Sequence, residues 1–155
     1  MRQLLAWGVV LSAACGGGYH AGNLPEPQTP NSALDQFLAA VKAKDNNRMA
    51  QLWGNDKGSA SAVGKLPAGY VDSVVQVFQI YLRHEGYRII DGPTPVPGSP
   101  KIVIYHVELQ LRDCNRIQPF DMINTRRGGW LVRDPHIEAS AATIPHCRPR
   151  QGNND

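Results

Sequence analysis

Polar side chains that could do chemistry are concentrated in residues 101–138. Apolar and polar residues alternate along 101–112, and the polar positions are His106, Glu108, Gln110 and Arg112. Because alternate side chains of a strand point to the same face, this row shares one side of a sheet. Such a row can line a pocket, but it is more typical of a solvated sheet face, and we favour that interpretation.

The chain has three cysteines, Cys15, Cys114 and Cys147. If Cys15 is lipidated, the other two form an even pair in an oxidising compartment, which favours a disulfide. A bond that closes a loop of roughly 30 residues contributes about 3 kcal/mol. The alternative is a metal site formed by Cys114, His146 and Cys147. Because two of these ligands would be adjacent and no fourth is evident, no metal site is predicted.

Composition and motifs exclude several functional classes. The formal charge is +3, the longest basic run is Arg126-Arg127, and neither indicates nucleic acid as a partner. No Gly-rich phosphate loop, serine nucleophile elbow, HExxH or CxxC motif occurs, so no cofactor is predicted. The hydrophobic fraction of 42% is sufficient for one globular core.

Residues 1–14 have the layout of a signal peptide. Arg2 precedes an apolar run over residues 4–11, which is shorter than the roughly 20 residues that a transmembrane helix needs. The segment LSAAC, residues 11–15, resembles the lipobox of bacterial lipoproteins, although Ser12 replaces the usual leucine. This resemblance implies fatty acylation of Cys15, for example with palmitate. The alternative is an ordinary signal peptide with a chance cysteine.

The predicted lipid anchor defines the domain organisation. Lipidated Cys15 begins a flexible, Gly- and Pro-rich tether over residues 15–31. A single domain follows over residues 32–148, and residues 149–155 form a disordered tail. We expect the protein in the bacterial cell envelope, held by its lipid at the outer membrane or at the extracytoplasmic face of a membrane.

The first half of the domain is predicted to be helical. Ser32 and Asp35 resemble a capping box, and Leu34, Phe37, Leu38 and Val41 follow at helical spacing. The predicted helices cover residues 32–45, 47–53 and 70–85, with Gly54 as the end of the second and a loop over 54–69.

The second half is predicted to be an antiparallel meander, which makes the fold class α+β. The proline-rich residues 91–100 indicate a connector or an edge strand. Turns are expected at residues 113–115 and 126–129, the second supported by Gly128 and Gly129. The predicted strands cover residues 87–90, 101–112, 117–125 and 130–133.

Two segments carry a resemblance to a known superfamily. They are SALDQFLAAVKAKDNNRMAQLW, residues 32–53, and FDMINTRRGGWLVRD, residues 120–134. Helices followed by long antiparallel strands and a Gly-Gly-Trp hairpin resemble the nuclear transport factor 2-like superfamily, which includes ketosteroid isomerase and polyketide cyclases. The break at Lys44-Asp45-Asn46 and the aromatic Trp53 are similar to those of the family. The resemblance covers about residues 32–138.

The resemblance implies a cone in which a curved sheet of three to four strands wraps the helices around a pocket. Aromatic residues are the candidate pocket lining: Trp53, Phe78, Tyr105, Phe120 and Trp130. An acid inside an apolar cone could act as a general base, as in ketosteroid isomerase. The candidates for such a catalytic set are Asp121, His106, Tyr81 and Tyr105.

The position of Asp121 in the sequence argues against a catalytic role inside the core. It stands between Phe120 and Met122, so if those side chains face the core, Asp121 faces the opposite side of the strand. The enzyme hypothesis requires Asp121 or His106 to point into a closed apolar cavity beside a tyrosine. Buried tyrosines are more often core residues whose hydroxyl finds a partner.

The favoured function is that of a non-catalytic, membrane-anchored lipoprotein whose domain binds a small apolar ligand or an envelope protein. The first alternative is a cofactor-free isomerase, dehydratase or cyclase. The second is an interaction role in which the sheet face forms a homodimer or a complex. No fold of this kind specifies a function by itself.

Overall fold

The structure, a computed structural model, describes residues 24–62, 66–67, 69–138 and 148–149, and only the backbone of the last two. The elements, in chain order, are α1 (Pro30–Ala43), α2 (Asn46–Leu52), β1 (Gly54–Asn55), β2 (Gly58–Ser59), α3 (Tyr70–Tyr81), β3 (Gly86–Val96), β4 (Ser99–Gln110), β5 (Cys114–Asn124), β6 (Trp130–Asp134) and β7 (Arg148–Pro149). Within these ranges, no helix combines the length and apolarity needed to cross a membrane. The α+β class predicted from the sequence is confirmed, because helices precede an antiparallel sheet and pack against it.

Helix α1 begins two residues before the predicted start. Its N-cap is Thr29, whose Oγ1 accepts a hydrogen bond of 3.1 Å from the backbone N–H of Ser32, and Pro30 opens the first turn. Ser32 is therefore inside the helix, and the predicted Ser32–Asp35 capping box is wrong. The helix ends at Lys44, which adopts a left-handed conformation with φ of 57°.

Helix α2 confirms the predicted second helix with small shifts at its ends. Asp45 caps it by accepting a 2.9 Å hydrogen bond from the backbone N–H of Arg48. The predicted glycine cap is wrong, because Trp53 ends the helix in an extended conformation and Gly54 begins β1. The predicted loop that follows contains the small antiparallel pair β1–β2.

Helix α3 confirms the helical interpretation of a valine-rich segment. Its inward face is provided by Val75 and Phe78, and Leu82, directly after the last turn, is fully buried. The opposite face remains in solvent, with Val77 and Ile80 exposed by 40% and 64%. The helix is shorter than predicted because it ends at Tyr81, and Gly86 is already the first residue of β3.

The main sheet is antiparallel in the order β3-β4-β5-β6, and β7 pairs with the start of β5. β3 is an edge strand, which explains how it accommodates prolines, and its pairing with β4 contains register shifts. β5 starts at Cys114, three residues earlier than predicted, so Cys114 and Asn115 belong to the strand and not to the turn.

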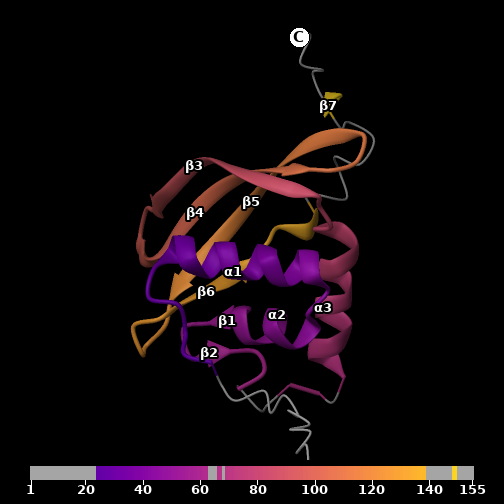
Figure 1. The fold of residues 1–155 in the computed structure, drawn as a ribbon. Coiled ribbons are helices and arrows are strands. Elements are labelled where there is room, and N and C mark those ends of the chain that lie inside the picture. The colour runs from indigo at the N-terminus through magenta and orange to yellow at the C-terminus, as the bar shows by residue number, and fades with distance from the viewer. Residues whose placement is uncertain (1–23, 63–65, 68, 139–147, 150–155) are drawn as a thin grey trace, which may run out of the picture.

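The helices pack against one face of the sheet, as Figure 1 shows for α1 in front of β5 and β6. Side chains from α1, α2, α3, β4, β5 and β6 form a single core. Its largest fully buried members include Phe37, Tyr105 and Phe120. The alternation of β4 is confirmed, because Tyr105, Val107 and Leu109 are fully buried whereas His106 is exposed.

The segment that precedes α1 lies against the end of the sheet. The backbone N–H of Trp130 donates a 2.8 Å hydrogen bond to the carbonyl oxygen of Pro27, and Pro27 is buried. Residues 24–29 are therefore part of the folded unit, whereas the sequence predicted a tether as far as residue 31. The predicted signal peptide, Cys15 and the start of the tether lie outside the described residues.

Candidate functional site

A cavity lies between the end of α3 and the turn that joins β4 to β5. Its volume is about 740 Å³, within the range of about 300–1,000 Å³ that is usual for small-molecule sites. We name it the helix-end cavity. Its lining combines apolar and charged side chains: Ile80, Tyr81, Arg83, His84, Glu85, Leu111, Arg112, Asp113, Cys114 and Arg116.

Arg116 is the most buried charged residue that lines this cavity. It is only 5% exposed because it lies on the inward face of β5, in alternation with Cys114 and Gln118. Its Nη2 donates a hydrogen bond to the carbonyl oxygen of Tyr81, the last residue of α3. Its Nε is buried and has no hydrogen-bond partner among the described residues. Burial, and to a smaller extent repulsion from Arg83, lower the pKa of this guanidinium.

His84 provides a second unpaired polar atom in the cavity wall. Its Nδ1 lies 2.9 Å from the carbonyl oxygen of Leu82, so Nδ1 must carry the hydrogen. Its Nε2 is buried and has no hydrogen-bond partner within the described ranges. Burial is the main cause that lowers the pKa of His84, with a smaller contribution from Lys42. The imidazole is therefore held neutral, with Nε2 as a free acceptor.

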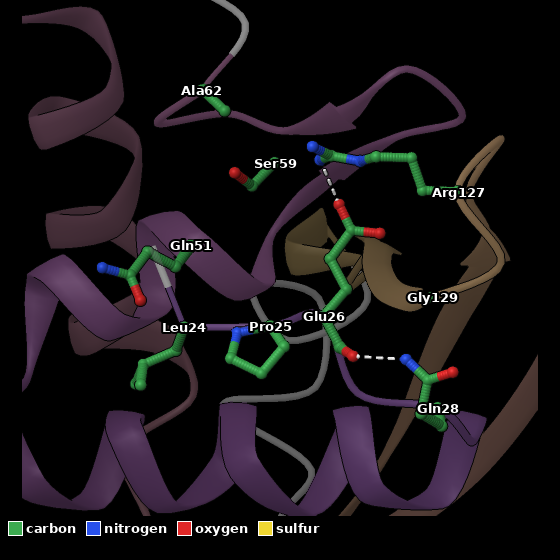
Figure 2. A pocket seen from close by; sticks show the side chains of 9 residues that line it. All are labelled: Leu24, Pro25, Glu26, Gln28, Gln51, Ser59, Ala62, Arg127 and Gly129. Atoms are coloured by element: carbon green, nitrogen blue, oxygen red, sulfur yellow. Dashed lines mark hydrogen bonds and ion pairs between the residues drawn. The ribbon is translucent and has the colours of Figure 1, made fainter. Parts of the chain in front are cut away.

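A smaller cavity of about 260 Å³ lies beneath the segment that precedes α1 (Figure 2). The Glu26 carboxylate is part of its wall, and this carboxylate already has partners within the domain. It forms an ion pair with Arg127, which lies in the β5–β6 turn, and it accepts a 2.6 Å hydrogen bond from Thr125 Oγ1. Glu26 thus joins the N-terminal segment to the β5–β6 turn, which is a structural role.

The predicted aromatic pocket is filled by its own side chains. The ring centroid of Phe37 lies 5.9 Å from that of Phe78 and 6.4 Å from that of Phe120, in edge-to-face contacts. Trp53 and Trp130 pack against the same core. None of the five pocket candidates (Trp53, Phe78, Tyr105, Phe120 and Trp130) lines either of the two cavities.

Asp121 points away from the core, as its position between two buried residues indicated. Phe120 and Met122 are fully buried, whereas the Asp121 side chain is 15% exposed on the outer face of β5. Its Oδ1 lies 3.0 Å from His136 Nε2, and its Oδ2 lies 3.9 Å from Arg133 Nη1. This ion-paired position is not the closed apolar cavity that the general-base hypothesis required.

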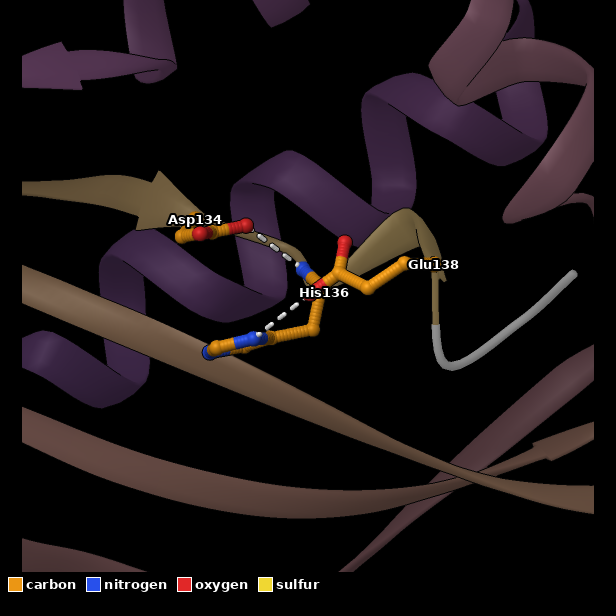
Figure 3. Close-up of side chains that lie close together, drawn as sticks. All are labelled: Asp134, His136 and Glu138. Carbon is orange, nitrogen blue, oxygen red and sulfur yellow. Dashed lines mark hydrogen bonds and ion pairs between the residues drawn. The ribbon is translucent and has the colours of Figure 1, made fainter. Parts of the chain in front are cut away.

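His136 is at the centre of a carboxylate cluster that follows β6 (Figure 3). Its Nδ1 lies 3.2 Å from Glu138 Oε1, and its backbone N–H donates a 2.8 Å hydrogen bond to Asp134 Oδ1. Burial disfavours the charged imidazolium, but the hydrogen bond that its Nε2 donates to Asp121 and the nearby charge of Asp134 outweigh it, so the pKa of His136 is raised.

The cluster also has donor atoms that are close enough for a metal ion. One atom each from Asp134, His136 and Glu138 lies within 4.8 Å of the others. However, a histidine ligand must offer an unprotonated nitrogen, whereas both ring nitrogens of His136 face carboxylates and its pKa is raised. The geometry therefore fits an imidazolium held by carboxylates better than a metal site.

The other catalytic candidates are separated from one another. His106 is 46% exposed on the outer sheet face, where its Nδ1 lies 3.5 Å from Asp91 Oδ2. The hydroxyl of Tyr105 is inside the domain and donates to Asn31 Oδ1. Tyr81 is half-buried and is the one candidate of the four that lines the helix-end cavity. Among the described residues, no hydrogen bond or ion pair joins any two of these four candidates.

Sequence reasoning missed Arg116 and His84 as site residues. A signal for Arg116 was present, because counting back from Phe120 in steps of two places Gln118, Arg116 and Cys114 on the inward face. The predicted turn ended at Asn115 and the predicted strand began at Ile117, so Arg116 was assigned to neither element. His84 had no such signal, because its position depends on where α3 ends.

Comparisons with known proteins give one structural likeness. No family model matches the sequence, and no curated protein matches it. A crystal structure of a presumed ketosteroid isomerase from Shewanella frigidimarina NCIMB 400 is similar over 66% of this chain and 89% of its own, with 14% identity and a TM-score of 0.41. A likeness at this level assigns neither a family nor an activity to the chain.

Proposed function

We propose that this chain is a cell-envelope lipoprotein whose α+β domain binds a small ligand in the helix-end cavity. The observation that carries the proposal is the cavity itself, about 740 Å³ with a buried arginine and apolar side chains in its wall. Apolar contact area with a few polar groups that fix orientation is the usual composition of a ligand site.

The apolar wall supplies the reason for a ligand to enter. Ile80 is 64% exposed, and Tyr81 and Leu111 are half-buried beside it. Covering an exposed isoleucine side chain contributes about 1 kcal/mol or more to binding. Because these side chains belong to the end of α3 and to the β4–β5 turn, the ligand would lie at one end of the domain (Figure 1).

Binding without catalysis is favoured by the places of the candidate catalytic residues. Asp121 lies on the outer face of β5 in contact with His136, and His106 is exposed on the same side of the sheet. A general base must reach the proton that it removes in the bound substrate. Neither residue lines the helix-end cavity.

The lipid anchor is proposed on the N-terminal pattern alone. The Leu11–Cys15 segment supports cleavage before Cys15 and acylation of that cysteine. Residues 24–29 are bound to the domain, so the proposed tether between the lipid and the domain is limited to residues 15–23.

A disulfide between Cys114 and Cys147 is part of the proposal. Its support is the pairing of β7 with β5, which sets Arg148 opposite Asn115 and Pro149 opposite Cys114. Cys147 precedes Arg148 directly in the sequence. Alkylation of the denatured, unreduced protein followed by mass measurement tests the bond, and modification of both cysteines without prior reduction would exclude it.

Binding is tested with the neutral fluorescent probe N-phenyl-1-naphthylamine and the full-length chain. We expect saturable binding that Ile80→Glu weakens about fivefold, since it removes about 1 kcal/mol of apolar contact. Val77→Glu is the matched control, because Val77 is also exposed on α3 but does not line the cavity. Absence of binding, or equal loss in both variants, would contradict the proposed site.

A further inference from the structure

The helix-end cavity contains a buried positive charge that no carboxylate of the described residues neutralises. Arg116 is 5% exposed, and among the described residues no ion pair joins it to an acid. A guanidinium keeps its proton at any ordinary pH, so this charge persists. Buried charges are normally paired, because an unpaired one loses hydration without compensation.

The hydrogen-bond capacity of Arg116 is also incompletely used. Its Nη2 donates to the carbonyl oxygen of Tyr81, whereas its Nε is buried and finds no acceptor in the part of the chain that the structure describes. A planar guanidinium presents its donors in a fixed fork that matches the oxygens of a carboxylate or phosphate. The unpaired donor and the unpaired charge therefore require the same partner, an oxyanion.

The remaining charges of the lining do not provide that partner. Three arginines (Arg83, Arg112 and Arg116) and two carboxylates (Glu85 and Asp113) line the cavity, which gives a formal charge of +1. Glu85 and Asp113 are exposed, and Arg83 repels the guanidinium of Arg116. Charges exposed to water are screened, so the field inside the cavity is dominated by the buried cation.

We propose that the ligand of the helix-end cavity is an anionic amphiphile, whose oxyanion binds Arg116 and whose apolar body lies against Ile80, Tyr81 and Leu111. This inference rests on the proposed binding function and specifies its ligand class. A small anion alone would leave most of the volume of about 740 Å³ unfilled. An uncharged apolar molecule would leave the Arg116 charge buried and unpaired.

The test compares ligands that share one chain and differ in charge. Calorimetric titration of the full-length chain with decanoate, decanol and decyltrimethylammonium separates the charge of the ligand from its apolar body. We expect decanoate to bind about tenfold more tightly than decanol, as a charge-assisted hydrogen bond to a buried guanidinium would give. Decyltrimethylammonium is expected to bind more weakly than decanol because Arg116 repels it.

Two further arms identify the group that is recognised. Acetate and inorganic phosphate carry the oxyanion without the apolar body, and we expect both to bind at least tenfold more weakly than decanoate. Arg116→Gln should remove the preference for decanoate over decanol, and Arg116→Lys should retain part of it. Arg88→Gln is the control for an exposed arginine outside the lining and should change the preference less than twofold.

The outcomes distinguish a failure of the anionic ligand class from a failure of the proposed binding function. Equal affinity for decanoate and decanol, with both weakened by Ile80→Glu, would overturn the anionic class and leave the binding function intact. Phosphate binding as tight as decanoate binding would overturn the amphiphile and identify a small-anion site. If no chain-bearing ligand binds, both proposals fail. The comparison of charges uses the wild-type protein, so the test holds even if an Arg116 variant does not fold.

Discussion

Arg116 shows how a single buried charge can make the helix-end cavity selective for the charge of its ligand. Most residues on the inward face of β5 are apolar, and the exceptions are Arg116 and Gln118. Gln118 is fully buried but satisfied, because its Nε2 donates a 2.9 Å hydrogen bond to the carbonyl oxygen of His136. In contrast, the buried Nε of Arg116 has no hydrogen-bond partner among the described residues. Two buried polar residues on one strand thus have different roles, one in structure and one in the proposed recognition of a ligand.

His136 should make the stability of the domain depend on pH. Its pKa in the folded protein is raised, so its stabilising contribution is complete below the unfolded-state pKa of about 6.5 and is lost as the pH rises through the folded-state pKa. His136→Gln should therefore reduce the free energy of unfolding at pH ~5 more than at pH ~8. Because the side chain is 30% exposed, solvent screening limits the difference to about 1 kcal/mol.

Chemical denaturation of both proteins at the two pH values measures the His136 effect. Asp121→Asn provides the control, because it removes the carboxylate that lies 3.0 Å from His136 Nε2. In that background the pH dependence of the His136→Gln effect should become smaller. A loss of stability that is the same at both pH values would contradict the assignment of a stabilising imidazolium.

At the scale of elements, the β5–β6 hairpin is the part of the sheet that fixes the start of the domain. A Cβ atom added at Gly129 would lie 2.3 Å from Glu26 Cβ and 2.6 Å from Glu26 Oε2. Glycine is required here by the close approach of another segment. The hairpin therefore explains why residues 24–29 are ordered against the sheet although their composition suggests a tether.

Gly129→Ala should destabilise the domain by about 1–3 kcal/mol, the usual cost of forcing extra volume into a packed contact. The Glu26 side chain would have to move, which disturbs its pair with Arg127 and its hydrogen bond from Thr125. Gly128→Asn is the matched control. No heavy atom lies within 4 Å of its added Cβ, and asparagine tolerates the φ of +85° found there. Equal losses in thermal denaturation would show that the close contact with Glu26 is not important.

The elements that could be predicted are those whose periodicity is unbroken. Alternation identified β4, and helical spacing of Val71, Val74, Val75 and Phe78 identified α3 despite its β-branched residues. The alternation of β5 was harder to follow, since Arg116 and Gln118 occupy inward positions where apolar residues are expected. The strand was therefore predicted too short, and the residue that matters most to the site was missed.

The cavity itself was not predictable from the sequence. It is formed by the end of α3 and the β4–β5 turn, which are separated by 26 residues of edge strand and β4 between His84 and Leu111. No local sequence pattern indicates that the end of α3 and the β4–β5 turn lie next to each other. The aromatic residues proposed as a pocket wall were recognised correctly as inward-facing, but they fill the space they surround.

At the scale of the whole molecule, we propose a ligand-binding domain that is held at a membrane by a lipid on Cys15. Residues 24–29 lie against the domain, so nine residues, 15–23, remain as the proposed tether between the lipid and the domain. A tether of nine residues spans at most about 30 Å when fully extended. Figure 1 shows the end of α3 and the β4–β5 turn at the opposite end of the domain from the segment that precedes α1, so the helix-end cavity would lie at the end of the domain that is far from the anchor.

Acylation of Cys15 is tested by metabolic labelling with a radioactive fatty acid. The wild-type chain should carry the label and sediment with membranes, and Cys15→Ala should lose both properties. Cys114→Ala is the control for a cysteine within the domain, and it should retain the label. A Cys15→Ala protein that is still labelled would contradict the lipid anchor without affecting the proposed ligand site.

The central claim is that the ligand binds at the end of α3 and not inside the helix–sheet core. The most direct measurement is a map of amide chemical shifts in two-dimensional NMR spectra of the full-length chain as decanoate is added. We predict that the shifts are concentrated in residues 80–85 and 111–116, whereas Phe37, Tyr105 and Phe120 change little. Shifts centred on those three core residues, or on the outer face of the sheet around His106 and Asp121, would contradict the account.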